Sequence, residues 1–184
     1  MISVNEALQI LHENIPAPMT ELISIESAHG RRLSDDINAP ESSPRYTNSA
    51  MDGFAVRWKD CSKASSEHPI SLKVIGESQA GIPFENLITS NSAIRISTGA
   101  MLPEGADTIV RVEDTRENGE NVEILSAKTL RQDIRHEGEE FKEGNRLFSK
   151  GIVLGARELA LLAAVGETTR DRTEHSQCQA TDTD

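Results

Sequence analysis

Short alternating apolar segments, separated by turns, run through the middle of the 184-residue chain, from residue 46 to about residue 134. In Ile70–Val74 an apolar residue stands at every second position, as a strand with one buried face requires. Asn118-Gly119 separates two further segments of this kind and is a strong hairpin signal. Several short strands at this spacing predict a small β-barrel or sandwich.

Helical periodicity replaces this alternation at both ends of the chain. Ser3 and Glu6 have the spacing of a capping box at a helix start. The apolar stripe that follows consists of Val4, Ala7, Leu8, Leu11 and Ile15. A second helix is predicted over Ala156–Val165, with Gly166 as the residue that ends it.

We therefore expect an α+β fold with two domains. A discontinuous α/β domain would combine residues 1–45 with 139–166, and a small β-barrel-like domain of residues 46–138 would be inserted into it. Residues 167–184 are polar, with two alanines as their only aliphatic side chains, so we expect a disordered tail. The first helix has two possible places, either in this α/β domain or against another part of a longer protein.

The charge and cysteine content exclude several classes of function. The net charge is −11 and Lys and Arg do not cluster, which argues against binding of nucleic acid or an anionic membrane. Neither a run of about 18 apolar residues nor a secretory signal is present, so a cytoplasmic protein is expected. Cys61 and Cys178 stand far apart in polar surroundings, which predicts neither a disulfide framework nor a metal site.

The stretch Ser43–Val56 is the most distinctive part of the sequence. Asn48–Val56 reads N-S-A-M-D-G-F-A-V, and Gly53 permits a sharp turn directly after Asp52. Backbone donors can hold an aspartate in such a turn with its carboxylate directed into a cleft. A solvated Asx-turn is the ordinary explanation of a single Asp-Gly pair, and the length of the pattern is what argues against it.

Three further segments carry recognisable patterns in a fixed order. Ala80–Pro83 reads A-G-I-P, and Ile94–Thr108 reads I-R-I-S-T-G-A-M-L-P-E-G-A-D-T. Ile134–Glu140 reads I-R-H-E-G-E-E. Together with the Asp52 segment, they resemble the signature of the molybdopterin molybdenumtransferases, the MoeA type with gephyrin's E domain as the animal relative. The resemblance covers nearly all of residues 1–166.

The resemblance implies an activity in molybdenum cofactor biosynthesis. Such an enzyme takes adenylated molybdopterin, cleaves its phosphoanhydride with release of AMP, and inserts molybdate at the dithiolene with the help of Mg²⁺. Asp52 is then the expected catalytic residue and a candidate Mg²⁺ ligand. The expected substrate-binding residues are Ser49, Thr98, Gly99 and Arg135. The resemblance also implies a homodimer, with the molybdopterin adenylyltransferase as a further candidate partner.

The residues themselves leave alternatives open at these positions. Thr98-Gly99-Ala100 offers a hydroxyl and backbone N–H groups to an oxyanion, but it is also an ordinary turn at a strand end. Arg135 offers a guanidinium fork to phosphate, or a surface salt bridge to Glu137 or Glu139. Glu140 stands where the family carries Asp, which displaces the carboxylate by about one methylene and leaves its role open.

The resemblance stops at Gly166, where the family continues into a large α/β domain that supplies most nucleotide and molybdate contacts. A frameshift, a natural truncation and sequence added for expression would all explain the polar end. Three functions follow: an N-terminal fragment of a molybdenumtransferase that is inactive by itself, a non-catalytic dimerisation or scaffold module derived from the family, and an unrelated acidic binding domain.

Overall fold

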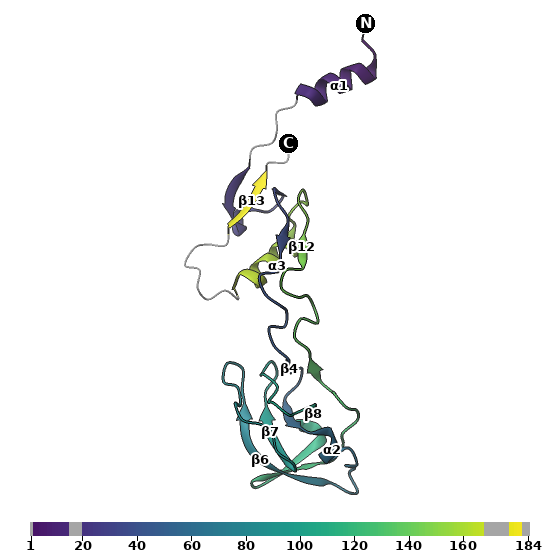
Figure 1. The fold of residues 1–184 in the computed structure, drawn as a ribbon, viewed down its shortest axis with the longest axis vertical. Helices are drawn as coiled ribbons and strands as arrows, with labels where there is room; N and C mark the ends of the chain where they lie inside the picture. The colour runs from purple at the N-terminus through teal and green to yellow at the C-terminus, as the bar shows by residue number, and fades with distance from the viewer. Residues whose placement is uncertain (1, 15–19, 168–176, 182–184) are drawn as a thin grey trace. The chain divides into compact units, whose positions relative to one another are not determined.

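The computed structural model describes residues 2–14, 20–167 and 177–181 (Figure 1). The helices are α1 (Val4–Asn14), α2 (Trp58–Cys61) and α3 (Ala156–Glu167), with 3₁₀ turns η1 (Ile25–Ser27) and η2 (Val112–Asp114). The strands are β1 (Glu21–Ser24), β2 (Arg32–Leu33), β3 (Ile37–Asn38), β4 (Asn48–Ser49), β5 (Gly53–Val56), β6 (Ile70–Ser78), β7 (Ser92–Ile96), β8 (Thr108–Arg111), β9 (Thr115–Asn118), β10 (Asn121–Ile124), β11 (Ile134–Arg135), β12 (Arg146–Phe148) and β13 (Gln177–Thr181).

The elements form a mixed, sheet-dominated α+β structure in two compact units. Unit 1 combines Met1–Pro40 with Gly144–Asp184, and unit 2 is Glu41–Glu143. The domain boundaries expected from the sequence, at 45/46 and 138/139, stay a prediction. No helix in the described part of the chain is both long and apolar enough to cross a membrane.

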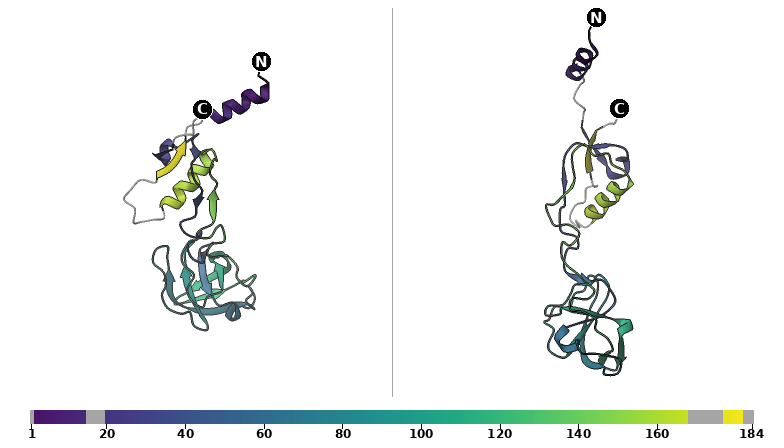
Figure 2. Two further views of the ribbon diagram at one scale, coloured as in Figure 1. Left: turned by 45° about the horizontal axis from the view of Figure 1, so that its top comes forward. Right: turned by 90° about the vertical axis from the view of Figure 1, so that its right-hand side faces the viewer.

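Unit 2 is built on a six-stranded sheet in the order β8-β5-β7-β6-β10-β9. All neighbouring strands are antiparallel except β6 and β7, which are parallel. Val110 on β8 and Val122 on β10 are separated by three strands in this order, yet they belong to one buried cluster. The sheet must therefore curl on itself, and Figures 1 and 2 show this curl in the lower part of each view.

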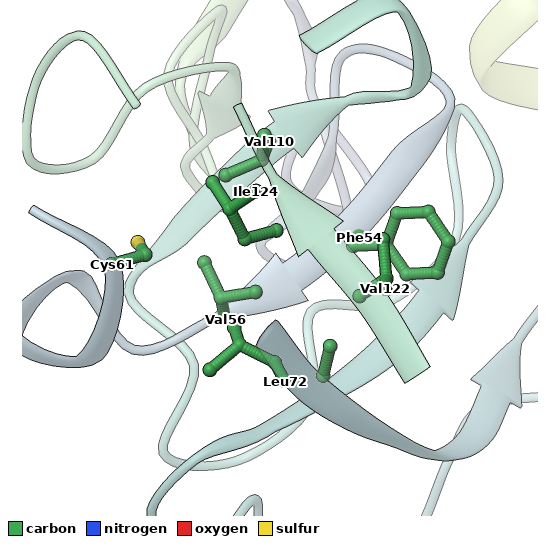
Figure 3. Packing of buried hydrophobic residues seen from close by; sticks show 8 residues of the cluster. Phe54, Val56, Cys61, Leu72, Val110, Val122 and Ile124 are labelled. Carbon is green, nitrogen blue, oxygen red and sulfur yellow. The ribbon is translucent and has the colours of Figure 1, made fainter. Parts of the chain in front are cut away.

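The curled sheet buries apolar side chains on both faces. One cluster consists of Phe54, Val56, Cys61, Leu72, Ala93, Val110, Val122 and Ile124 (Figure 3). The second consists of Ala55, Ile88, Ile94, Ile96, Ala100 and Ile109. Phe54 and Ala55 are neighbours on β5 and point to opposite faces, so every residue of β5 is buried. Because β5 directly follows Asp52, the core of this unit fixes the end of the Asp52 segment.

The local predictions within this sheet are confirmed. β6 begins at Ile70 and alternates between buried and exposed side chains. β9 and β10 form the hairpin expected around Asn118-Gly119, with Asn118 opposite Asn121. β8 ends at Arg111, where the chain leaves the sheet and continues as η2.

Unit 1 packs α3 against short strands and turns. Its buried cluster consists of Ala28, Leu33, Leu154 and Leu162, and Ile23, Ile25, Ile37, Phe148 and Leu159 pack around it. β12 pairs with β3, and a second sheet has the order β1-β13-β2. α3 extends through Gly166 to Glu167, so the prediction that Gly166 ends this helix is wrong.

The expected disordered tail differs from the structure over five residues. Gln177–Thr181 form β13, which pairs antiparallel with β1 on one side and with β2 on the other. Residues 168–176 and 182–184 lie outside the described residues. The expectation relied on apolar side chains, whereas strand pairing between two open edges stabilises a segment through main-chain hydrogen bonds.

The capping box at the start of α1 is confirmed. The Glu6 amide donates to Ser3 Oγ at 3.2 Å, and the Ser3 amide donates to Glu6 Oε2 at 2.7 Å. The backbone hydrogen bond lowers the pKa of Glu6, which keeps this carboxylate ionised. The helix buries none of its residues in the described structure, and its apolar residues Val4, Leu8 and Leu11 are exposed.

Candidate functional site

Residues 50–52 form a tight loop, here called the Asp52 loop, between β4 and β5. Ser49 shapes its beginning, because its hydroxyl donates to the Met51 carbonyl at 2.6 Å and accepts from the Met51 amide at 3.3 Å. Directly after the loop, Gly53 packs closely against the backbone of β8. This local geometry leaves the side chain of Asp52 exposed to solvent.

One oxygen of the Asp52 carboxylate is held by the residue that follows β7. Asp52 Oδ1 accepts a hydrogen bond from the Thr98 amide at 2.7 Å and another from Thr98 Oγ1 at 3.0 Å. The other oxygen, Oδ2, has no protein partner among the described residues. The carboxylate is thus fixed in orientation while one of its oxygens remains available to a ligand.

These hydrogen bonds also stabilise the charge of Asp52. The Thr98 amide, and then the Thr98 hydroxyl, lower the pKa of Asp52 below its ordinary value because they stabilise the ionised form. The site therefore presents a permanent negative charge at neutral pH. Such a group can bind a cation, accept a proton weakly, or orient a polar substrate.

The backbone donors of the turn after β7 are already used within the chain. Thr98 N–H binds Asp52, Gly99 N–H donates to the Ser49 carbonyl at 2.8 Å, and Ala100 N–H donates to the Ser97 carbonyl at 3.0 Å. The N–H groups that this turn could offer to an oxyanion therefore have acceptors within the chain, and substrate binding by Thr98 and Gly99 stays a prediction. A phosphate would have to replace Asp52 or Ser49 as the acceptor.

Two other residues of the signature, Asn48 and Ser49, form β4 and directly precede the loop. Ser49 is fully buried, which favours a role in shaping the loop over the direct substrate contact expected from the sequence. Asn48 is 7% exposed, and its side-chain nitrogen Nδ2 donates to the Tyr46 carbonyl at 3.1 Å. Among the described residues, Asn48 Oδ1 is a buried side-chain acceptor without a hydrogen-bond partner.

The fourth sequence segment, Ile134–Glu140, lies beside the first, which contains Asp52. β11 pairs with β4, with Arg135 opposite Asn48 and Ile134 opposite Ser49. Arg135 is exposed, and no ion pair to Glu137 or Glu139 is found in the described part of the chain. Arg135 thus lies on the strand that pairs with β4, which leads into the Asp52 loop, and its side chain is exposed.

Glu140 has a definite partner in the structure. Its Oε2 atom accepts a hydrogen bond from Ser43 Oγ at 2.7 Å, and its amide donates to the Ser43 carbonyl at 2.9 Å. The carboxylate that replaces the family Asp is therefore held by the residue that opens the signature stretch.

Ser78, which the sequence did not single out, joins the chain next to the second segment, Ala80–Pro83, to the third, Ile94–Thr108. Ser78 Oγ donates to the Met101 carbonyl at 2.9 Å and accepts from the Phe84 amide at 3.4 Å. Its carbonyl accepts from the Ser97 amide at 3.2 Å. A serine at the end of a strand carries no sequence signal for this role. The third segment thus contacts Asp52 through Thr98, the fourth pairs with β4, and the residue two positions before the second segment bonds to the third.

The residues at the site fit Mg²⁺ only in combination with a substrate. No group of three or more His, Cys, Asp or Glu side chains that could hold a metal ion is found in residues 2–14 and 20–167. Mg²⁺ is commonly bound by one or two carboxylates, with water and substrate phosphates as its other ligands. The free Oδ2 atom of Asp52 is suited to this mode of binding.

Known proteins match this chain over most of its length. The chain is 34% identical over 168 residues to a molybdopterin molybdenumtransferase of Nostoc sp. and 36% identical over 168 residues to one of Haemophilus influenzae. These matches cover 89% and 90% of this chain but 38% and 40% of the relatives. The chain thus spans about two fifths of the length of these relatives.

Solved structures show the same similarity. Two crystal structures of the molybdopterin biosynthesis MoeA protein from Pyrococcus horikoshii superpose with TM-scores of 0.82 and 0.81 at 30% identity. They cover 98% and 96% of this chain and 44% and 45% of those chains. The sequence model of one protein family, described as the MoeA N-terminal region (domain I and II), matches residues 2–166. These residues contain all four sequence segments named above. The chain therefore belongs to the family of the MoeA N-terminal region.

Proposed function

We propose that this chain acts in molybdenum cofactor biosynthesis, as the part of a molybdopterin molybdenumtransferase that carries Asp52. The full reaction inserts molybdate into adenylated molybdopterin and releases AMP. Family membership and the names of the relatives support the reaction class. The observation that carries the assignment to a site is the exposed Asp52 carboxylate, held by Thr98 through one oxygen.

In this proposal the chain's own residues have distinct tasks. Asp52 stays ionised and directs its free oxygen towards the reacting phosphate and molybdate, while Thr98 and Gly99 fix the turn that holds it. Arg135 contacts a phosphate of the substrate, because a guanidinium fork suits phosphate oxygens. Mg²⁺, when bound at Asp52 together with the substrate, would neutralise negative charge that develops during phosphoanhydride cleavage.

The proposed partners are the small-molecule substrates, a second copy of the chain and the molybdopterin adenylyltransferase that would supply the adenylated substrate. Homodimerisation and the adenylyltransferase contact rest on the family resemblance. A scaffold function alone would not require an exposed carboxylate that is fixed and ionised. The geometry of Asp52 therefore favours the enzymatic function.

A complemented assay tests the proposal. The 184-residue chain is supplied with the parts of a curated relative that lie beyond the matched region, together with adenylated molybdopterin, molybdate and Mg²⁺. AMP release and formation of active cofactor are measured for the unchanged chain, for Asp52→Asn and for the control Asp35→Asn, another exposed aspartate.

We expect activity from the unchanged chain and from Asp35→Asn, and a loss of about 10²-fold or more for Asp52→Asn, as for other groups that act in a transition state. Equal activity of the two variants would refute the role of Asp52. An absence of AMP release from every complemented protein would refute the proposed reaction.

A further inference from the structure

The Asp52 loop is held by main-chain hydrogen bonds from two segments that are distant in sequence. On one side, the Ala50 amide donates to the Asp133 carbonyl at 2.8 Å. On the other side, the Val112 amide donates to the Asp52 carbonyl at 3.2 Å. The segment before β11 and the end of β8 thus fix the two halves of the loop independently of Thr98.

A bidentate ion pair joins these two holding segments to each other. Arg111 Nε donates to Asp133 Oδ2 at 2.8 Å, and a terminal guanidinium nitrogen donates to Asp133 Oδ1, also at 2.8 Å. The Asp133 side chain is 12% exposed and that of Arg111 is 41% exposed. Gln132 Nε2 donates a further hydrogen bond to Asp133 Oδ2 at 3.1 Å. Paired bonds in fixed directions specify geometry better than a single contact does.

The position of Arg111 closes a ring around the loop. Arg111 stands opposite Gly53 in the pairing of β8 with β5, and Val112 follows it directly. Its side chain reaches the residue whose carbonyl accepts from Ala50. The ring therefore consists of the loop, the end of β8, the ion pair and Asp133.

The backbone at Asp133 directs its carbonyl and its carboxylate to different partners. Asp133 has φ +54°, in the left-handed region that most side chains avoid. Aspartate tolerates this region better than most residues, and the bend directs its carbonyl to Ala50 while its carboxylate reaches Arg111. An unfavourable conformation persists where surrounding contacts determine it.

We propose that the Arg111–Asp133 ion pair positions the Asp52 loop, so that both residues support the proposed reaction through Asp52 without contacting substrate. The inference rests on the proposed function for its consequence in catalysis, but its structural part is independent of that function. Loss of the ion pair leaves the two holding segments free to separate, and the main-chain bonds to Ala50 and Asp52 then open more often.

Another ion pair in the same unit provides a matched control. Arg116 and Glu123 stand opposite each other on β9 and β10, and Arg116 Nε donates to Glu123 Oε2 at 2.8 Å. These strands are already joined by sheet pairing, so this ion pair closes no ring of its own. Glu123→Gln removes a charge of the same sign at a comparable pair without touching the Asp52 loop.

Amide hydrogen exchange of the 184-residue chain, followed by NMR, is the test. Asp133→Gly removes the carboxylate while glycine readily adopts the positive φ. We expect the amides of Ala50, Val112 and Thr98 to exchange about tenfold faster in this variant, the factor for losing a charge-assisted hydrogen bond. Amides of β7 and all amides of Glu123→Gln should keep their exchange rates.

Two further variants separate positioning from general destabilisation. Asp133→Asn keeps the shape and one acceptor oxygen but replaces the other oxygen with an NH₂ donor, so it should restore only part of the protection. Arg111→Lys cannot make the two parallel bonds and should resemble Asp133→Gly. Unchanged exchange at Ala50 and Val112, or an equal acceleration across β7 as well, would overturn the proposal.

The complemented assay adds a catalytic measurement. Asp133→Gly should lower kcat with little change in KM, because it disturbs the orientation of Asp52 and leaves the other substrate contacts in place. If Asp52 proves dispensable while the exchange pattern appears as expected, the proposed function fails and the positioning role stands. If Asp52 is required and the exchange pattern is absent, only the positioning role fails.

Discussion

Gly53 lies against the backbone of Val110 so closely that a Cβ atom at Gly53 would stand 2.0 Å from the Val110 carbonyl oxygen. The same Cβ would lie 2.9 Å from the Cα atom of Arg111. Because both neighbours are backbone atoms of β8, they cannot move aside as a flexible side chain could. The glycine of the signature is therefore required by the packing of β5 against β8, whatever the function of Asp52.

Gly53→Ala should destabilise the protein strongly. The clash forces β5 away from β8, and we expect the free energy of unfolding to fall by about 3 kcal/mol or more. Gly119→Ala is the control, since Gly119 has φ +61° but open space around its Cβ position, and it should cost only about 1–2 kcal/mol. Urea unfolding of both variants measures the difference, and equal losses would contradict the prediction.

Asp52→Ala should affect function far more than stability. Asp52 is exposed, so its removal should change the free energy of unfolding by less than about 1 kcal/mol, the usual range for surface positions. In the complemented assay the same variant should lose most of its molybdate insertion. A loss of several kcal/mol in thermal or urea unfolding would instead identify Asp52 as a structural residue.

Asp36 should make the stability of unit 1 depend on acid pH. Its carboxylate accepts from the Lys150 amide at 2.8 Å and from Arg146 at 3.2 Å, and these bonds, the backbone one first, lower the pKa of Asp36. Since its folded pKa lies below its unfolded value, the stabilisation is complete above about pH 4 and is lost as the pH falls through the folded pKa.

NMR titration of the Asp36 carboxyl carbon measures this effect. Arg146→Gln should bring the pKa part of the way back towards its ordinary value, because the Lys150 amide remains in place. An Asp36 pKa at or above that of an unstructured aspartate in the unchanged protein would contradict the prediction.

Cys61 should not react with thiol reagents in the folded protein. It is fully buried, and burial first, then the charges of Asp107 and Asp60, raises the pKa of its thiol to about 11. At pH 8 the thiolate that reacts is therefore scarce as well as inaccessible. In a Cys178→Ser background, iodoacetamide should label the protein only after denaturation. Labelling of the native protein at the rate of a free thiol would contradict this.

The 184-residue chain by itself should not insert molybdate at the rate of a full-length enzyme. Cleavage of a phosphoanhydride needs several donors placed for the transition state, and each missing donor costs about 10²–10³ in rate. Here the N–H groups of Thr98, Gly99 and Ala100 are engaged within the chain, which leaves Arg135 as the accessible cationic donor of the four segments. AMP release at the full-length rate would refute this argument.

Interactions between neighbours in sequence could be predicted without the structure. The capping box joins Ser3 and Glu6, and the β9–β10 hairpin turns at Gly119. The alternation in β6 likewise depends on residue types at successive positions. Such features are decided by nearby side chains and backbone preferences, so a single sequence contains them. The end of α3 differs from the prediction by a single residue, since the helix continues through Gly166 to Glu167.

The sequence by itself therefore determined the short β-strands of the middle of the chain and the helices near its ends, and it singled out the segment around Asp52. The tertiary structure decided what Asp52 contacts. Thr98 is 46 residues away from Asp52, and Arg111 and Asp133 are 22 residues apart. Asp52 and Thr98 meet because β5 and β7 pair with Gly53 opposite Ile96. Arg111 and Asp133 meet because the Ile109 amide on β8 donates to the Gln132 carbonyl. Both contacts depend on the register of segments that are distant in sequence. The register depends on the packing of many side chains at once, and no local pattern in the sequence encodes it.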